Sequence, residues 1–525
     1  MSRTNELPVR GSTELSPLRV VIFRYRRLLV RWLGGKSGPS LHTKLGLALI
    51  LFLLSFSIKA VQAVDLSPVM YTRHQPGFGM SAEYDRDASS IVEGAGILKP
   101  RDWDPGDTSL LARDPGYSIF LSVVYSRTAT SYFYVQLIQN AINSVSPVLI
   151  FLIGGLLITW RVGFVGGILA AVSHHLSYYS NLVLPDSLSA LPVLLAVYVL
   201  VRAKRSRHPT LVAYGLAGLL LGLGAWLRPN LLLMGPILAI VLTLASSRRL
   251  QEMRRACLVA ILPLLVVAPI TIRNYLIFHQ FVPISENMGI VLWEGIGDAG
   301  GGEFGALTED RAVANEESVM YGNPRYAEAW SSPDGISRDR DRIKRSLAVI
   351  IRHPIWFGGA MAGRMRKMVS YVAEADLIQG SPPDDSGGQL EPAAEDTDKP
   401  EKAARRRESA LRQEIARGRA LAFGEAISRV RPAARSLQRI AKETSEPLAL
   451  LGLALVLIFA PRRSLMLLGV PLYYLVVQST MHLEFRYTLP MHYFLFLFAA
   501  TVWTLIGAAV WRLMRMMARW CVERI

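Results

Sequence analysis

The chain has 525 residues, of which 51% are hydrophobic, and a formal net charge of +17. The apolar residues are gathered into long runs, which is typical of a polytopic membrane protein and excludes a soluble domain built around one core. Many Arg and Lys residues lie in short segments between these runs, so membrane topology accounts for the charge and nucleic-acid binding is excluded.

Residues 1–42 form a basic segment that we expect to be cytoplasmic. Within it, residues 20–33 interleave arginines with apolar residues. This pattern predicts either an amphipathic helix on the inner leaflet or an unevenly charged solvated tail. Because a long polar and basic segment precedes the first apolar run, we expect that run to be a membrane anchor and no cleavable signal peptide to be present.

Ten apolar runs approach the length of about twenty residues that a transmembrane helix needs. They lie at 44–64, 132–160, 162–182, 185–201, 211–227, 231–245, 257–272, 448–460, 465–478 and 489–511. The sequence therefore predicts an all-α polytopic membrane protein with about ten transmembrane helices and two long outer loops.

The distribution of basic residues predicts the topology. With the N-terminus inside, every predicted cytoplasmic connection carries Arg or Lys, as the positive-inside rule requires. Both termini are then cytoplasmic, in the cell (inner) membrane, and residues 65–131 and 273–446 are outside. The predicted domains are a basic N-terminal segment 1–42, a transmembrane core 43–272 containing the first outer loop 65–131, an extracytoplasmic loop domain 273–446, C-terminal transmembrane helices 447–511 and a basic tail 512–525.

The second outer loop has an uneven composition. Residues 346–375 predict an amphipathic helix with a break at Pro354, lying at the membrane interface. Residues 380–409 have almost no large apolar side chains, so we expect them to be disordered. A helical pattern resumes at Ala410, is interrupted at Pro432 and leads into the eighth span. The loop is therefore predicted to form a small, partly disordered domain.

Ionisable and polar residues collect at the predicted outer ends of the spans. They are Glu83, Asp85, Asp87, Arg113, Asp114, His174, His175, Tyr178, Tyr179, Asp186, Arg228, Arg273, Asn274, Glu484 and Arg486. A carboxylate beside a cavity can take the proton of a hydroxyl group, and nearby arginines can hold a phosphate. No Walker or zinc-protease motif accompanies them, so ATP-driven transport and zinc proteolysis have no motif support. Cys257 and Cys521 indicate neither a disulfide framework nor a thiolate metal site.

Several of these residues have structural alternatives. Asp186 precedes an apolar helical run and could serve as its N-cap. Arg228 could extend along the apolar surface at the turn made by Pro229. His174 and His175 are residues that more often pack or donate hydrogen bonds than bind a ligand.

Six motifs resemble one family of membrane proteins. They are Tyr84, Ala88, Ile91 and Gly94 in EYDRDASSIVEG; RDPGYSIFL at 113–121, followed by Gln136; YYSNLVLPDSL at 178–188; GLLLGLGAWLRPNLLL at 218–233; TIRNYLIFHQFVPISENMGIVLWEG at 271–295; and HLEFRYTLPMHYFLFLFAA at 482–500. In this order they are similar to the lipid-phosphate-sugar-dependent glycosyltransferases of the C-type fold, the bacterial relatives of protein O-mannosyltransferases and of aminoarabinose transferases.

The resemblance implies an activity and its site. It implies that the core 43–272 is catalytic and that a first-loop carboxylate is the base while an acceptor hydroxyl displaces polyprenyl phosphate with inversion. Many relatives carry the acid about four residues before the loop tyrosine, where this chain has Met80. Glu83 is then the first candidate and Asp85 the second, with Asp87 on the face of Glu83 if the loop is helical and Asp65 a further alternative.

The remaining expected site residues follow from the same resemblance. We expect Asp186 at the catalytic centre, Arg113, Arg228 and Arg486 at the donor phosphate, and Tyr84, Tyr117, Tyr179 and Asn274 in the substrate cavity. The expected partners are a polyprenyl-phosphate-linked sugar, the bilayer and a protein, lipid or glycan acceptor. No cofactor or metal ligand is assigned, and a divalent metal stays an open requirement. Polysaccharide ligase or polymerase activity, secondary transport and a catalytically inactive scaffold are the alternatives.

Overall fold

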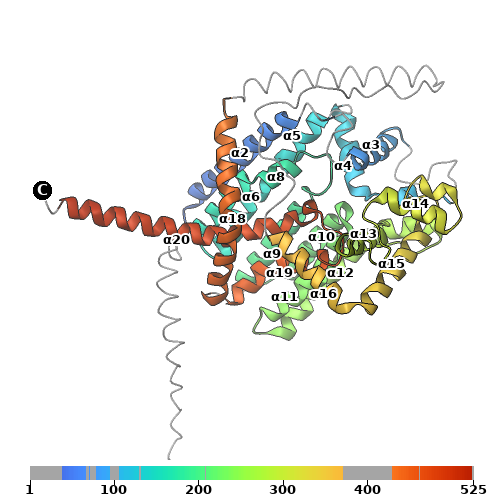
Figure 1. Ribbon diagram of the computed structural model, residues 1–525. Helices are drawn as coiled ribbons and strands as arrows, with labels where there is room; N and C mark the ends of the chain where they lie inside the picture. Colours follow the sequence, from blue (N-terminus) through green and yellow to red (C-terminus); the bar gives the residue numbers. More distant parts are fainter. Residues whose placement is uncertain are drawn as a thin grey trace, which may run out of the picture.

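The computed structural model describes residues 38–66, 70, 78–94, 106–128, 132–206, 209–369, 429–459 and 461–522. These residues form helices joined by turns, and they contain no β-strand (Figure 1). The predicted all-α class is confirmed for this part of the chain. The predicted amphipathic segment 20–33, the predicted disordered stretch 380–409 and the start of the helical pattern at Ala410 lie outside the described residues.

Each of the ten predicted spans contains a helix. The helices are α2 (Leu41–Leu66), α5 (Tyr132–Asn143), α6 (Val145–Leu157), α7 (Trp160–Val172), α9 (Ala190–Arg205), α10 (Leu211–Leu227), α11 (Met234–Leu244), α12 (Arg249–Phe278), α18 (Arg431–Phe459), α19 (Pro461–Gln478) and α20 (Leu489–Val522). Among the described residues, four helical stretches are long and apolar enough to cross a membrane: Leu41–Leu66, Tyr132–Leu157, Arg249–Phe278 and Phe485–Trp520. The count of ten spans and the sidedness of the loops stay predictions.

Several predicted boundaries are wrong. The second predicted span is two helices that meet at Ser144, and the fourth span begins at Ala190 instead of Pro185. Pro432 lies in the first turn of α18, which begins at Arg431, so its missing N–H has no intrahelical partner to lose; the helical pattern predicted before it, as far as residue 428, lies outside the described residues. Helix α20 extends through the predicted basic tail as far as Val522.

Close backbone contact between small residues packs the apolar helices. A Cβ atom added to Gly154 in α6 would lie only 2.6 Å from the Cα atom of Gly163 in α7. Small residues allow such an approach, which membrane helices need because lipid supplies little hydrophobic driving force between them. In the same bundle α10 packs on α12 and α18 packs on α20, so helices distant in sequence share one core.

The first loop is partly helical and packs on itself. It contains α3 (Phe78–Val92), the 3₁₀ turn η1 (Ser109–Leu111) and α4 (Pro115–Thr128). α3 lies against α4, and the rings of Tyr84 and Tyr117 meet edge to face with centroids 5.1 Å apart. The described connections in the bundle add α8 (His174–Tyr179), η2 (Pro229–Leu233) and η4 (Phe485–Thr488).

Residues 279–369, named here the loop domain, form a separate group of helices. They are α13 (Met288–Gly300), α14 (Asp310–Met320), η3 (Pro324–Ala327), α15 (Gly335–Arg352) and α16 (Pro354–Val369). Figure 1 shows α14 and α15 at the edge opposite to the C-terminal end of α20. The predicted helix break at Pro354 is confirmed, although α15 begins earlier than predicted. Trp293, Ile296, Val313 and Trp330 form a second hydrophobic core, to which Ala112 of the first loop also belongs.

Candidate active site

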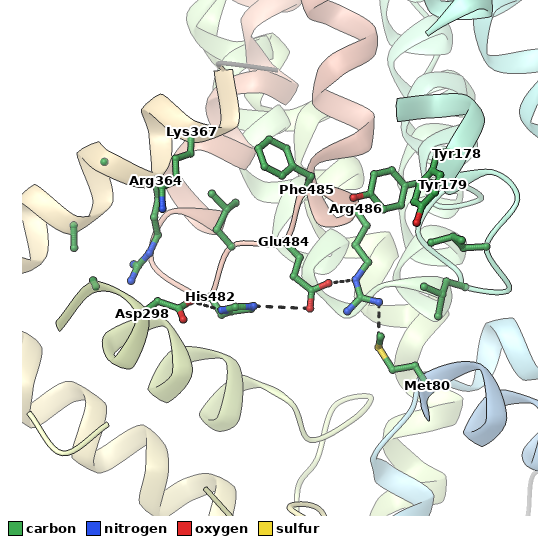
Figure 2. Close-up of a pocket in the computed structure, with 16 residues that line it drawn as sticks. Met80, Tyr178, Tyr179, Asp298, Arg364, Lys367, His482, Glu484, Phe485 and Arg486 are labelled. Atoms are coloured by element: carbon green, nitrogen blue, oxygen red, sulfur yellow. Dashed lines mark hydrogen bonds and ion pairs between the residues drawn. The ribbon is translucent and has the colours of Figure 1, made fainter. Parts of the chain in front are cut away.

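A cavity of about 820 Å³ lies where the apolar helices meet the loop domain. Figure 2 shows Tyr178 and Tyr179, at the end of α8, on one side of the cavity, and Asp298 of α13 with Arg364 and Lys367 of α16 on the other. Leu182 and Leu184, which follow α8, also line the cavity. The charged side chains that line the cavity are Asp298, Arg364, Lys367, His482, Glu484 and Arg486. This lining suits a ligand that combines an anionic group with apolar parts.

A row of polar contacts crosses the cavity (Figure 2). His482 Nδ1 contacts Asp298, and its Nε2 lies 3.9 Å from Glu484 Oε1. Glu484 in turn pairs with Nε of Arg486. Arg486 Nη1 lies 3.1 Å from the sulfur of Met80. The row therefore joins the loop domain, the segment after α19 and the start of α3.

Main-chain contacts hold His482 against α13. Its N–H donates to the carbonyl oxygen of Val291 at 2.9 Å, and its own carbonyl oxygen accepts from Gln478 Nε2 at 3.0 Å. The approach is close enough that a Cβ atom on Gly295 would lie 2.6 Å from His482 N. Gly295 precedes Asp298 by about one helical turn, so the two face the same segment. The position of His482 thus depends on a glycine in α13.

Arg364 also links α13 to the segment that follows α19. Its Nη1 donates to the carbonyl oxygen of Ser479 at 2.8 Å, and its Nη2 donates to the carbonyl oxygen of Gly295. The side chain is buried, so these two bonds satisfy a guanidinium that water barely reaches. We assign Arg364 mainly to holding α16, α13 and the segment after α19 together.

The two first-loop carboxylates expected to be catalytic lie on α3 but are not among the cavity-lining residues. Glu83 forms an ion pair with Arg113. Asp85 accepts hydrogen bonds from the hydroxyl groups of Tyr125 and Tyr132. Burial raises the pKa of Asp85 to about 7. Met80, at the position where many relatives keep the acid, does line the cavity.

The alternative carboxylates on the first loop have other environments. Because α3 is helical, Asp87 does share a face with Glu83, and burial raises the pKa of Asp87 to about 6. Asp65 forms an ion pair of 2.7 Å with Arg431, which joins α2 to α18. Neither is among the cavity-lining residues.

Asp186 and Arg228 form an ion pair, and neither is among the cavity-lining residues. Asp186 is not an N-cap, because α9 begins at Ala190 and its cap position is Ser189. The Arg228 guanidinium lies 4.8 Å from the ring centroid of Tyr487, and the Arg486 guanidinium lies 5.0 Å from the same ring. Tyr487 therefore connects the two arginines through cation–π contacts.

The residues expected in the substrate cavity separate into two groups. Tyr179 lines the cavity, together with Arg486. Tyr84 and Tyr117 are buried between α3 and α4, and Tyr117 donates to Gln139 Oε1 at 3.0 Å. Asn274 Nδ2 donates to the carbonyl oxygens of Val282 and Ile284 at 3.0 and 2.9 Å, which shapes the turn after α12.

Four charged residues of the cavity were not expected from the sequence: Asp298, Arg364, Lys367 and His482. The stretch HLEFR before the last span carried a usable signal, because it places three ionisable residues at a predicted outer end. Asp298, by contrast, stands in a glycine-rich stretch with no pattern around it. Among the described residues, no group of three His, Cys, Asp or Glu is arranged to hold a metal ion.

Comparison with known proteins gives one family match and several similar folds. Residues 114–272 match the family model described as dolichyl-phosphate-mannose-protein mannosyltransferase. No curated protein matches the chain. The apo crystal structure of the Archaeoglobus fulgidus oligosaccharyltransferase is similar with a TM-score of 0.50 and 13% identity, over 91% of this chain and 52% of that one.

A second structure, archaeal oligosaccharyltransferase AglB from Archaeoglobus fulgidus in complex with an inhibitory peptide and a dolichol-phosphate, has a TM-score of 0.47 and 14% identity, over 92% of this chain and 52% of that one. The chain thus spans about half the length of the solved structures that it matches. The predicted resemblance to the C-type-fold membrane glycosyltransferases is confirmed by the match of residues 114–272 to the mannosyltransferase family model and by the similarity of the fold over most of the chain.

Proposed function

We propose that this protein is a membrane glycosyltransferase that moves a sugar from a polyprenyl-phosphate donor to an acceptor hydroxyl group. The observation that carries the proposal is the cavity, in which Arg486 and Lys367 lie beside aromatic and aliphatic side chains. A lipid-linked sugar phosphate needs both kinds of surface, since its phosphate is anionic and its lipid is apolar. The mannosyltransferase family match at residues 114–272 supports the same class of donor.

The proposed reaction is an in-line displacement at the anomeric carbon of the sugar. The acceptor oxygen forms a bond to that carbon while the bond to the phosphate oxygen breaks, and the configuration inverts. The electron pair of the broken bond stays on the polyprenyl phosphate, and the acceptor proton passes to a base. Negative charge grows on the leaving phosphate, so preorganised cations lower the barrier.

Arg486 is our first assignment for the donor phosphate, because it lines the cavity and is nearly buried. Arg228 is assigned a supporting role, since it does not line the cavity and shares the ring of Tyr487 with Arg486. Arg113 is also proposed to bind the donor phosphate. It would first have to exchange its ion pair with Glu83 for the donor.

The base expected from the family resemblance is a first-loop carboxylate. In this role Glu83 must leave Arg113, or Asp85 must leave the hydroxyl groups of Tyr125 and Tyr132. Asp186 would have to leave Arg228. Each is retained as a proposal that substrate binding would have to activate.

The remaining details of the proposal come from the sequence and the family. The transferred group is a hexosyl or pentosyl sugar, and the acceptor is a protein, lipid or glycan. The protein is proposed to lie in the cell (inner) membrane with both termini cytoplasmic and the cavity on the outer face. If the acceptor is a growing glycan, the enzyme is a polysaccharide ligase or polymerase. Analysis of the reaction product distinguishes this alternative.

The direct test is donor turnover by the full-length protein. Purified protein in lipid nanodiscs is incubated with a panel of polyprenyl-phosphate sugars and with membrane extract as the acceptor source. We expect release of polyprenyl phosphate with at least one donor, together with a product in which the anomeric configuration is inverted. Absence of release with every donor, from protein shown to be folded, contradicts the proposal.

Changing Gly295 to alanine is expected to lower sugar transfer strongly while leaving the membrane helices folded. The new Cβ atom would meet the backbone of His482 and Met481, which must then move away from α13. The row of contacts from Asp298 to Arg486 would be displaced with it. A misplacement of about 1 Å at a catalytic centre can cost about 100-fold in rate.

The matched control is Gly359→Ala in α16, where an added Cβ atom meets no neighbour within 4 Å. This variant should keep wild-type turnover and thermal stability. Equal activity of the two variants would show that the contact between α13 and the His482 segment is not needed for function.

A further inference from the structure

The Asp298 and His482 pair has the arrangement of a residue that is oriented to accept a proton. Asp298 lies on α13 and His482 on the segment between α19 and η4, so tertiary folding alone brings them together. Asp298 contacts Nδ1 of the imidazole. The other ring nitrogen, Nε2, faces the carboxylate of Glu484 at 3.9 Å, which is beyond hydrogen-bond distance.

This contact selects the tautomer of a neutral imidazole. An ionised carboxylate accepts a proton and does not donate one, so the Nδ1 atom beside it carries the hydrogen and Nε2 holds the lone pair. The same division of roles operates when an aspartate orients a catalytic histidine. Nε2 therefore presents a basic nitrogen among residues that line the cavity.

The imidazole is also held in place before any ligand arrives. Main-chain bonds from His482 to Val291 and from Gln478 to His482 fix the segment on both sides. Arg364 donates hydrogen bonds to the carbonyl oxygens of both Gly295 and Ser479, which holds α13 next to the segment that follows α19. Fixed orientation of the groups that act on a substrate is the main requirement for general-base catalysis.

We infer that His482, positioned by Asp298, is the general base that deprotonates the acceptor hydroxyl in the sugar transfer proposed above, on which this inference rests. The hydroxyl proton moves to Nε2 of His482 as the acceptor oxygen bonds to the anomeric carbon. The bond between that carbon and the phosphate oxygen breaks, and its electron pair leaves with the polyprenyl phosphate beside Arg486. The imidazolium afterwards releases its proton to water, so His482 is a catalytic residue and Asp298 a positioning residue.

The location of the groups favours His482 over the first-loop carboxylates. Glu83 and Asp85 are engaged by Arg113 and by two tyrosines, and neither is among the cavity-lining residues. His482 keeps its contact with Asp298 through Nδ1, and its Nε2 atom lies 3.9 Å from Glu484, beyond hydrogen-bond distance. It also lies four residues from Arg486, so the base and the phosphate-binding cation belong to one short segment.

The charges around His482 define a pH dependence. The hydrogen bond that His482 Nδ1 donates to Asp298 of α13 is the largest cause that raises the pKa of the imidazole, and the charges of Asp298 and Glu484 raise it further, while burial and Arg486 lower it. Arg364 and Lys367 of α16 add two further cations to the same cavity. A base must be unprotonated to act, so turnover should rise with pH as His482 loses its proton. Removing the Asp298 charge should move this rise to lower pH, because the imidazolium loses its partner.

The test compares pH profiles of turnover for the full-length protein in nanodiscs with an active donor. His482→Asn keeps an N–H in the Nδ1 position for Asp298 and removes the basic nitrogen. We expect it to lose about 100-fold or more of the rate and the rise with pH, within the usual range for a general base. Binding of polyprenyl phosphate should be unchanged. Asp298→Asn should be slower than wild type and should show the rise at lower pH.

The matched control is His279→Asn, since His279 is an exposed histidine in a left-handed conformation that asparagine also adopts. It should behave as wild type. If wild type turns over and His482→Asn keeps its rate and pH profile, the inference is overturned while the proposed function stands. If turnover is lost in Glu83→Gln but not in His482→Asn, the inference is also overturned, and the base is assigned to the first loop. An inactive wild type overturns both.

Discussion

Replacing Arg486 by glutamine is expected to lower the rate of sugar transfer by about 100- to 1000-fold, the usual effect of removing one group that stabilises developing negative charge. Arg486 is 6% exposed, and it lines the cavity between Glu484 and Tyr487. A cation in such a poorly solvated position interacts with a phosphate far more strongly than one in water. Glutamine keeps hydrogen-bonding capacity but supplies no charge.

The kinetic pattern distinguishes this role from a structural one. Loss of a phosphate contact should weaken the binding of polyprenyl phosphate and lower turnover, and leave the thermal-unfolding midpoint close to that of wild type. Arg366→Gln is the matched control, because Arg366 is an exposed arginine on α16 that does not line the cavity. If Arg486→Gln bound polyprenyl phosphate as tightly as wild type, Arg486 would not be the residue that binds the donor phosphate. Arg228 and Arg113 would then be the next candidates.

Replacing Glu317 by alanine is expected to destabilise the loop domain by about 3–5 kcal/mol, the usual cost of breaking a buried ion pair by removing one partner. Glu317 on α14 is fully buried. Its carboxylate accepts from Arg338 Nε at 2.7 Å and from Arg342 Nη2 at 2.6 Å, both on α15. Arg345 adds a third contact at 3.2 Å. Without this carboxylate, two buried guanidinium groups lose the acidic side chain with which they form ion pairs.

Hydrogen exchange measures this effect locally. The backbone amides of α14 and α15 should lose protection in Glu317→Ala, whereas those of the apolar helices should not. Glu303→Ala changes an exposed glutamate in the same domain and should leave protection unchanged. A change of less than about 1 kcal/mol in Glu317→Ala would mean that the cluster behaves as a surface ion pair.

The sequence predicted most helices because their signals are local. Each predicted apolar run contains at least one helix, and Pro354 marked the boundary between α15 and α16. The errors concern ends and breaks. The apolar pattern of the run 132–160 predicted one segment and missed the interruption at Ser144, although Pro147 disfavours a continuous helix there.

The prediction of the candidate site was less complete. The motifs led to Arg486 and Tyr179 in the cavity and to the first-loop helix, and they showed that Met80 stands where relatives often keep an acid. They did not indicate Asp298 or Lys367, because both residues lie outside the recognised motifs. They did not indicate His482 either, because only Arg486 was assigned to the site from the motif at 482–500. The partners of Glu83, Asp85 and Asp186 were also unknown from the sequence, since each lies on another element.

By itself, the sequence determined that this is an all-α membrane protein and which family of membrane glycosyltransferases it resembles. Both conclusions depend on hydropathy and short motifs, which are properties of neighbouring residues. Only the tertiary structure decided which charges share a cavity. Asp298 and His482 are 184 positions apart, and they meet because Gly295 and Arg364 fasten the segment after α19 to α13. Packing between distant elements of this kind leaves no periodic pattern in the chain.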